Sequence, residues 1–133
     1  MSEANIAVVQ SAYAAYARGD IGAVLSLLTP DVDWHTIGQR EDFPAFGPHK
    51  GVPAVQEFFK TVAENIDFSE FSPREFYCDR DKVFVLGHYA MTTRKNGRKV
   101  ASDWVHIFTF RGGRVMQFRE FLDTAQLANA HRA

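Results

Sequence analysis

The chain has 133 residues, of which 46% are hydrophobic and 23% are charged, and its formal net charge is −1. These values fit one globular domain over residues 1–133 with a sizeable core, and they leave no room for two ordinary domains. The 15 Lys and Arg nearly balance the 16 Asp and Glu, with no long basic run, so we do not expect nucleic-acid binding.

Cysteine content and the start of the chain indicate the compartment. Cys78 is the single cysteine, so no intramolecular disulfide can form and no oxidising compartment is needed. The segment from Met1 to Asn5 has neither the basic nor the apolar region of a secretory signal, and the apolar runs are far too short to span a membrane. We therefore expect a cytoplasmic protein that does not act at membranes.

The first segment predicts two helices. The first runs from Asn5 to Ala17, and one of its faces carries hydrophobic residues at spacings of three and four: Ile6, Val9, Tyr13 and Tyr16. The second runs from about Ile21 to Leu28, with Asp20 as its N-cap and Pro30 just beyond its end.

A strand, a loop and a third helix follow. Val32 to Thr36 is expected to be a short strand, and residues 37–51, with three glycines and two prolines, are expected to form a loop over a rim. Pro53 suits the first turn of a helix that continues through Val62.

The second half of the chain predicts strands. We expect them over residues 67–78, 82–95, 98–110 and 114–122, joined by turns at Asn96-Gly97 and Gly112-Gly113, with Asp123 capping a C-terminal helix. Helices followed by strands favour an α+β fold. The expected architecture is a cone, in which a curved, mainly antiparallel (mixed) sheet wraps around the helices and encloses one pocket.

Turn geometry predicts which side chains share a face. A two-residue turn at Asn96-Gly97 pairs Tyr89 with Trp104, and a three-residue turn at residues 111–113 pairs Trp104 with Glu120 and His106 with Phe118. These side chains share a largely apolar face, which we assign to the helix-covered side. The opposite face is too apolar to be fully exposed to solvent, so we expect a second subunit to cover it in a homodimer.

Several inward residues are candidates for a site. A buried, unpaired carboxylate is costly, so Glu120 and His106 form either an acid/base pair in a cavity or a satisfied pair that fixes the sheet. His35 is either a general base at the pocket mouth or an exposed residue at a strand end. The candidate ligand contacts are Trp34, Tyr89, Trp104 and Phe118, for which core packing is the alternative, and Tyr16, whose hydroxyl either points into the cavity or forms a local hydrogen bond. No spacing resembles a metal site, and no metal is expected.

Three segments resemble the nuclear transport factor 2-like superfamily, and most closely its SnoaL-like polyketide cyclase and ketosteroid isomerase branch. The first lies within residues 16–34 and contains Ala17-Arg18-Gly19-Asp20. The second lies within residues 51–59 and begins with Gly51-Val52-Pro53. The third lies within residues 110–123 and contains Arg111-Gly112-Gly113. The resemblance covers nearly the whole chain and implies the cone-shaped fold. This fold hosts both enzymes and non-enzymes, so the resemblance does not itself imply an activity.

The resemblance also relates single residues to known enzymes of the fold. Glu120 matches the water-activating aspartate of limonene epoxide hydrolase, whose other aspartate and arginine fall at Tyr89 and Gly87. His106 matches the protonated aspartate of ketosteroid isomerase, and the general base of that enzyme falls near His35. The chain therefore reproduces neither catalytic set.

Two functions remain open from the sequence. The first is an enzyme of isomerase, cyclase or hydrolase type, acting without a cofactor on a small apolar molecule, with Glu120 and His106 transferring protons and His35 assisting. The second is a non-catalytic module that binds a small ligand in the pocket or a partner on its outer face.

Overall fold

The computed structural model describes residues 2–133. Its elements in chain order are α1 (Ser2–Ala17), α2 (Ile21–Leu25), β1 (Leu28–Thr36), β2 (Gly47–Lys50), α3 (Val52–Asn65), β3 (Ile66–Asp79), β4 (Lys82–Thr93), β5 (Lys99–Arg111), β6 (Arg114–Phe121) and α4 (Thr124–Arg132).

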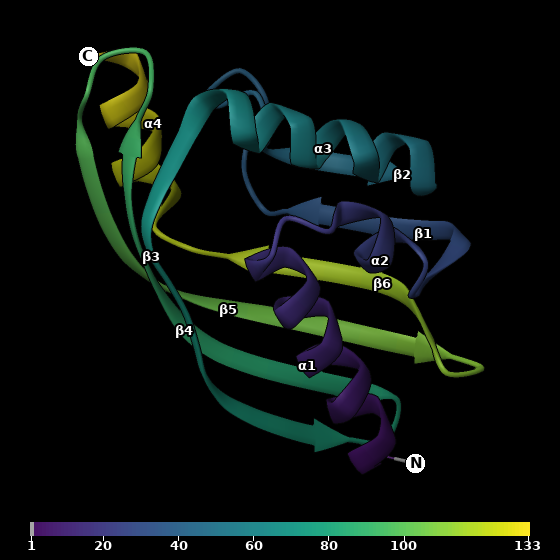
Figure 1. Ribbon diagram of the computed structural model, residues 1–133. Helices are drawn as coiled ribbons and strands as arrows, with labels where there is room; N and C mark the ends of the chain where they lie inside the picture. Colours follow the sequence, from purple (N-terminus) through teal and green to yellow (C-terminus); the bar gives the residue numbers. More distant parts are fainter. Residues whose placement is uncertain (1) are drawn as a thin grey trace.

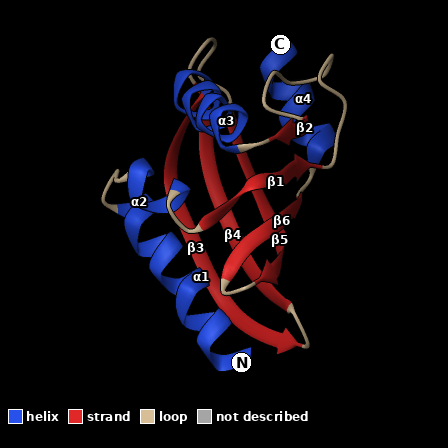
Figure 2. Cartoon of the chain, turned by 90° about the vertical axis from the view of Figure 1, so that its right-hand side faces the viewer, coloured by secondary structure: helices blue, strands red, loops and turns tan. Residues whose placement is uncertain are grey.

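All strands of the described residues belong to one curved sheet, in the order β2-β1-β6-β5-β4-β3. Neighbouring strands are antiparallel except β1 and β6, which are parallel. The sheet bends around the helices, with α1 packed on β3 and β4 and α3 packed on β1 and β2 (Figures 1 and 2). The predicted α+β class with a curved mixed sheet is confirmed.

Caps define the ends of the helices. The Asp20 carboxylate accepts a hydrogen bond from the backbone N–H of Ala23 at 3.1 Å, and Asp123 accepts one from Gln126 at 3.0 Å, as the sequence predicted. Helix α2 ends at Leu25, earlier than predicted. The backbone carbonyl of Leu27 instead accepts a hydrogen bond from Val115, so the following residues belong to the sheet.

The predicted loop over residues 37–51 contains an additional strand, β2, which pairs with β1 from Asp33↔Lys50 to Thr36↔Gly47. The side chain of Arg40 supports this segment by donating to the backbone carbonyl of Pro48 at 2.8 Å. A strand of four residues that contains Gly47 and Pro48 has little β propensity, so the sequence pattern could not reveal it.

The hairpin between β4 and β5 differs from its prediction by two residues. Tyr89 pairs with Ser102 and Gly87 with Trp104. A two-residue type I′ turn needs positive φ at both central residues. Gly97 has a φ of 70°, but Asn96 does not adopt positive φ. The Asn96 side chain donates to the backbone carbonyls of Ala130 in α4 and of Ala133 just beyond its end. The loop is therefore longer than predicted, and Asn96 in it attaches the C-terminal helix.

The hairpin between β5 and β6 also differs by two residues. Gly112 and Gly113 form a two-residue turn with φ of 59° and 81°, and a bulge between Thr109 and Phe110 adds one further residue of shift. As a result His106 lies directly opposite Glu120, rather than opposite Phe118. Because the error is even beyond the bulge, His106, Phe118 and Glu120 stay on their predicted face.

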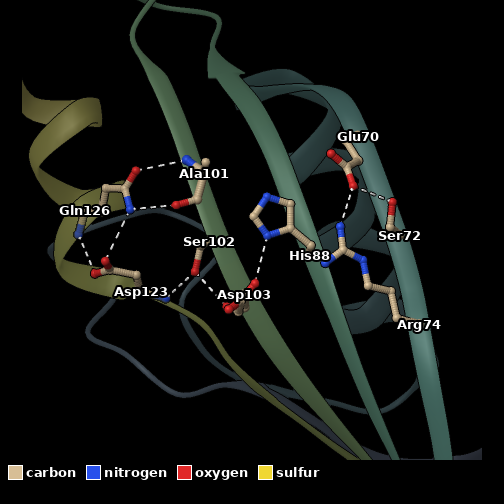
Figure 3. A network of polar contacts seen from close by, with 9 residues as sticks. All are labelled: Glu70, Ser72, Arg74, His88, Ala101, Ser102, Asp103, Asp123 and Gln126. Atoms are coloured by element: carbon tan, nitrogen blue, oxygen red, sulfur yellow. Dashed lines mark hydrogen bonds and ion pairs between the residues drawn. The ribbon is translucent and has the colours of Figure 1, made fainter.

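The outer face of the sheet carries a polar network on β3, β4 and β5 (Figure 3). His88 and Asp103 contact each other across the strands at 2.9 Å, and α4 is attached beside them through the Gln126 amide, which bonds both backbone groups of Ala101 at 2.9 Å. Among residues 2–133, no helix is long and apolar enough to cross a membrane.

Candidate functional site

A cavity of about 90 Å³ lies between the concave face of the sheet and helices α1 and α3. This is several times the space that one water molecule needs. Its walls are mostly aromatic and aliphatic side chains, contributed by α1, α3, the sheet, the segment before β2 and, through Leu127, α4. The polar side chains of the wall gather around Glu120, so the cavity is apolar with one polar corner.

Glu120 is buried, with 8% of the residue exposed, and each of its carboxylate oxygens has a hydrogen-bond partner. Oε1 accepts from the Thr36 hydroxyl at 2.7 Å, while Oε2 lies 2.9 Å from His106 Nε2 and also accepts from the Tyr89 hydroxyl. Three strands supply these partners: β1, β4 and β5. Oε2 is therefore fully engaged, whereas Oε1 keeps an acceptor position beyond its bond to Thr36.

The environment of Glu120 favours its ionised form. Burial alone would raise the pKa of this carboxyl group, but the hydrogen bonds and the charge interaction with His106, together with the hydrogen bonds from Tyr89 and Thr36, outweigh burial and lower the pKa. Glu120 is thus a carboxylate at neutral pH. Its negative charge in turn raises the pKa values of the phenols of Tyr13, Tyr16 and Tyr89, for which burial is the larger cause.

The ionised Glu120 fixes the tautomer of His106. Nε2 faces the carboxylate at 2.9 Å and must carry a proton, because a lone pair there would face a negative oxygen. The other ring nitrogen, Nδ1, lies 2.8 Å from the Tyr13 hydroxyl, which donates to it when the imidazole is neutral and accepts from it when the imidazole is protonated. Tyr13, His106 and Glu120 therefore form one hydrogen-bonded chain from helix α1 to strand β6.

Trp104 holds the ring of His106 from behind. The two rings stack with their centroids 3.8 Å apart and their planes inclined by 22°. Trp104 can lie this deep because Gly87 opposes it on β4: a Cβ atom at Gly87 would be 2.2 Å from the indole Cζ2. Trp104 does not itself line the cavity, so the structure places it behind the site rather than at the predicted ligand contact.

The structure places most of the other predicted contacts on the cavity wall. Tyr16, Trp34, Tyr89 and Phe118 all line it, together with His106 and Glu120. Trp34 and Phe118 stack with a centroid distance of 3.9 Å, across the parallel pairing of β1 with β6. The sequence-based face assignment therefore brings these residues together, although it does not show that they bind a ligand.

His35 lies elsewhere. Side chains alternate along β1, so Trp34 and Thr36 point inward while His35 points to the opposite face, beside Arg119 on β6. Burial and the Arg119 charge lower the pKa of His35, although Asp33 acts in the opposite direction. The expectation that His35 sits at the pocket mouth is corrected, because the residue is one position out of register with the inward face of its strand.

Two residues of the polar corner were not among the sequence-based candidates. Tyr13 binds His106, and Thr36 binds Glu120. The helical spacing put Tyr13 on the same face as Tyr16 but could not show which hydroxyl reaches the sheet. The alternation that placed Trp34 inward also places Thr36 inward, and this signal could have identified it.

The fold agrees with the comparisons to known proteins. The chain belongs to the SnoaL-like domain family, which matches residues 9–118. No curated protein sequence matches the chain with significance.

Several solved structures share the fold over nearly the full chain. A nuclear transport factor 2-like protein from Burkholderia xenovorans is 29% identical, with 98% of each chain covered and a TM-score of 0.89. A similar protein of unknown function from Burkholderia pseudomallei is 29% identical, with 100% of each chain covered and a TM-score of 0.87. TerC, co-crystallised with polyporic acid, is 26% identical, covers 98% of this chain and 99% of its own, and has a TM-score of 0.83.

Proposed function

We propose that the protein is a cofactor-independent acid/base enzyme, of isomerase, cyclase or hydrolase type, acting on a small and largely apolar molecule held in the cavity. The observation that carries this proposal is the chain of Tyr13, His106 and Glu120, which is buried, hydrogen-bonded and exposed to an otherwise apolar cavity. Ionisable groups placed in an apolar cavity are typical of catalytic sites.

Glu120 is the proposed general base. It is ionised, and Oε1 retains an acceptor position that can receive a proton from a carbon acid or from a water molecule. When Glu120 becomes neutral, its hydrogen bonds from Tyr89 and His106 weaken, and the proton then passes to another atom of the substrate. The carboxylate and its partners would thus take a proton from one position and return it to another.

His106 and Tyr13 are proposed to position and tune this base. The imidazole N–H orients the Glu120 carboxylate, and the Tyr13 hydroxyl holds the imidazole in the required tautomer. The apolar wall supplies the binding energy and excludes bulk water from the reacting atoms. The structure of TerC supports this proposal, since this protein of the same fold was co-crystallised with an organic molecule, polyporic acid.

The experiment compares proton transfer by the wild type and a Glu120→Gln variant. A panel of small aromatic and alicyclic ketones and epoxides, incubated in D₂O, reports proton abstraction and turnover by NMR. We expect Glu120→Gln to lower the rate by about 10² to 10⁴-fold, the usual contribution of a general base. Glu57→Gln, a change of the same type on the exposed surface of α3, is the matched control. A Glu120→Gln rate within twofold of the wild type would refute the proposed role.

The second candidate is a non-catalytic binding module, and one observation favours it. The polar side chains in contact with Glu120 and His106 already have protein partners, including both ring nitrogens of His106. Such mutual satisfaction is also what a purely structural network requires. Compounds that bind in the cavity without any exchange or turnover by the wild type would support this alternative.

A further inference from the structure

We propose that small molecules enter the cavity between α1, α3 and the edge strand β3, and that the ring of Phe71 must move aside to admit them. The inference rests on the proposed function in one respect, because it takes the cavity as the ligand site. It adds the route into that site and the residue that controls the route.

The exposure of the cavity wall marks the position of its mouth. The wall residues that come from β1, β4, β5 and β6 are all buried, as are those of α4 and of the segment before β2. Apart from Leu122, the half-buried wall residues belong to α1, α3 and β3, and α1 runs alongside β3 (Figure 2). They are Ala12, Tyr13, Tyr16, Phe59, Phe68 and Phe71. The cavity therefore meets solvent where these three elements come together.

A row of aromatic rings closes this mouth. The ring of Tyr16 lies between Phe59 of α3, at a centroid distance of 5.6 Å, and Phe71 of β3, at 5.1 Å. Phe68 continues the row, 5.3 Å from Phe71. Rings at such distances are in contact, so the row is continuous from α3 through α1 to β3. An organic molecule can pass only when one of these rings moves.

The backbone that carries Phe71 is the least restrained part of the row. β3 is an edge strand, so residues 70–73 are paired on one side only, with β4. A bulge lies at each end of this segment: the first leaves Ser69 without a partner on β4, and the second leaves Arg74 without one. Bulges interrupt the hydrogen-bonded ladder, and Pro73 has no N–H to donate. The segment is therefore bounded by two natural hinges.

Side chains on the outer face tie this segment to itself. The Glu70 carboxylate accepts hydrogen bonds from the Ser72 hydroxyl at 2.7 Å and from the Arg74 guanidinium at 3.1 Å (Figure 3). The Ser69 hydroxyl bonds to β4, where it donates to the backbone carbonyl of Ala90 at 3.1 Å, at the first bulge. The segment can thus swing about its bulges as one unit, together with the ring that it carries.

A closed mouth affects the rates of binding more than its strength. Binding that requires a conformational change has a lowered association rate constant, kon. The same barrier must be crossed on release, so the dissociation rate constant, koff, falls by the same factor. Removal of the ring that closes the mouth therefore raises kon. Loss of a simple ligand contact would instead raise koff and leave kon unchanged.

The test measures both rate constants with fluorobenzene as the probe. Exchange measurements by ¹⁹F NMR give koff, a titration gives Kd, and their ratio gives kon. In Phe71→Ala we expect kon to rise about tenfold, the upper value for one lost aromatic contact. Phe76→Ala is the matched control, because Phe76 is also half-buried on β3 and packs on Tyr13 at 6.0 Å, but it does not line the cavity. This control should leave kon unchanged.

A second variant makes β3 stiffer. Deletion of Ser69 removes the first bulge and leaves Phe68 and Phe71 two positions apart, so the alternation of side chains continues unbroken. We expect kon to fall severalfold with Kd unchanged. Ser69→Ala keeps the bulge and is the control for this variant.

The inference is overturned if kon is unchanged in both Phe71→Ala and the Ser69 deletion, or if Phe76→Ala raises kon as much as Phe71→Ala. It is also overturned if fluorobenzene does not bind in the cavity. None of these measurements depends on turnover, so a cavity with the expected rates but without any proton transfer would contradict only the proposed function.

Discussion

Gly87 offers the sharpest test of how the site is held. A Cβ atom at this position would lie 2.2 Å from Cζ2 and 2.5 Å from Cε2 of Trp104, and 2.6 Å from the backbone oxygen of Ser72. The indole cannot retreat freely, because its other face is stacked on His106 at 3.8 Å. Gly87→Ala must therefore move either the strand backbone or the ring that supports His106.

The cost follows from these contacts. Overpacking a dense core costs about 1–3 kcal/mol, and we expect the upper end because one of the clashing atoms belongs to the backbone. With an unfolding entropy of about 2.1 cal/mol/K per residue, a chain of this length loses roughly 3–4 °C of Tm per kcal/mol. Gly87→Ala should thus lower Tm by about 10 °C and should also disturb the bond between His106 and Glu120.

Calorimetry and urea unfolding followed by tryptophan fluorescence measure this effect. Gly22→Ala is the matched control, because its Cβ would meet only Asp20 Oδ1, at 3.8 Å, on the surface of helix α2. That control should be neutral or more stable by up to about 1 kcal/mol. The packing described above would be contradicted if the two variants were equally stable. It would also be contradicted if Gly87→Ala changed the free energy of unfolding by less than about 0.5 kcal/mol, the usual effect of a surface substitution.

Three further predictions follow from the polar corner and the outer face. Thr36→Val removes the 2.7 Å hydrogen bond to the buried Glu120 carboxylate, so urea unfolding should show a loss of about 1.5–3 kcal/mol, and a change below 0.5 kcal/mol would contradict it. Because folding lowers the pKa of Glu120 below its ordinary value of 4.5, its stabilising contribution is complete above that pH and is lost as the pH falls through the lower folded value. Between pH 3 and 7 the free energy of unfolding should therefore depend less on pH for Glu120→Gln than for the wild type. An equal pH dependence of the two proteins would argue against the lowered pKa of Glu120. On the outer sheet face Phe121 is 43% exposed beside the half-buried Val105 and Ile107, so we predict a homodimer, to be checked by sedimentation at micromolar concentration, where a monomer would disprove it.

The sequence was sufficient to predict the class of fold and the face on which most candidate residues lie. Alternation in strands has a period of two, and both hairpin registers were wrong by two residues, so His106, Glu120 and Tyr89 stayed on the inward face. Their partners could not be predicted in the same way. Register depends on the backbone conformation of Asn96 and on the bulge at Thr109, and neither is visible in a pattern of apolar and polar residues.

The identity of the interacting side chains depended on distances that spacing does not define. Tyr13 and Tyr16 share one helical face, yet only Tyr13 reaches His106, because the crossing of α1 over the sheet sets how deep each ring lies. His35 was misplaced by a single position, which in a strand is enough to reverse the side of the sheet. In both cases the sequence pattern lacks the tertiary arrangement of the elements, which determines where each side chain points.

The parallel pairing of β1 with β6 has a consequence for folding during translation. It sets Thr36 beside Glu120, 84 residues later in the chain, and makes the first long strand a neighbour of the last. During synthesis helices α1 to α3 and strands β1 to β5 leave the ribosome before β6, so a nascent chain that ends before Glu120 has a partial cavity wall and lacks this carboxylate. The polar corner is complete only when the last strand is inserted between β1 and β5, so a product of interrupted translation that ends before Glu120 lacks it.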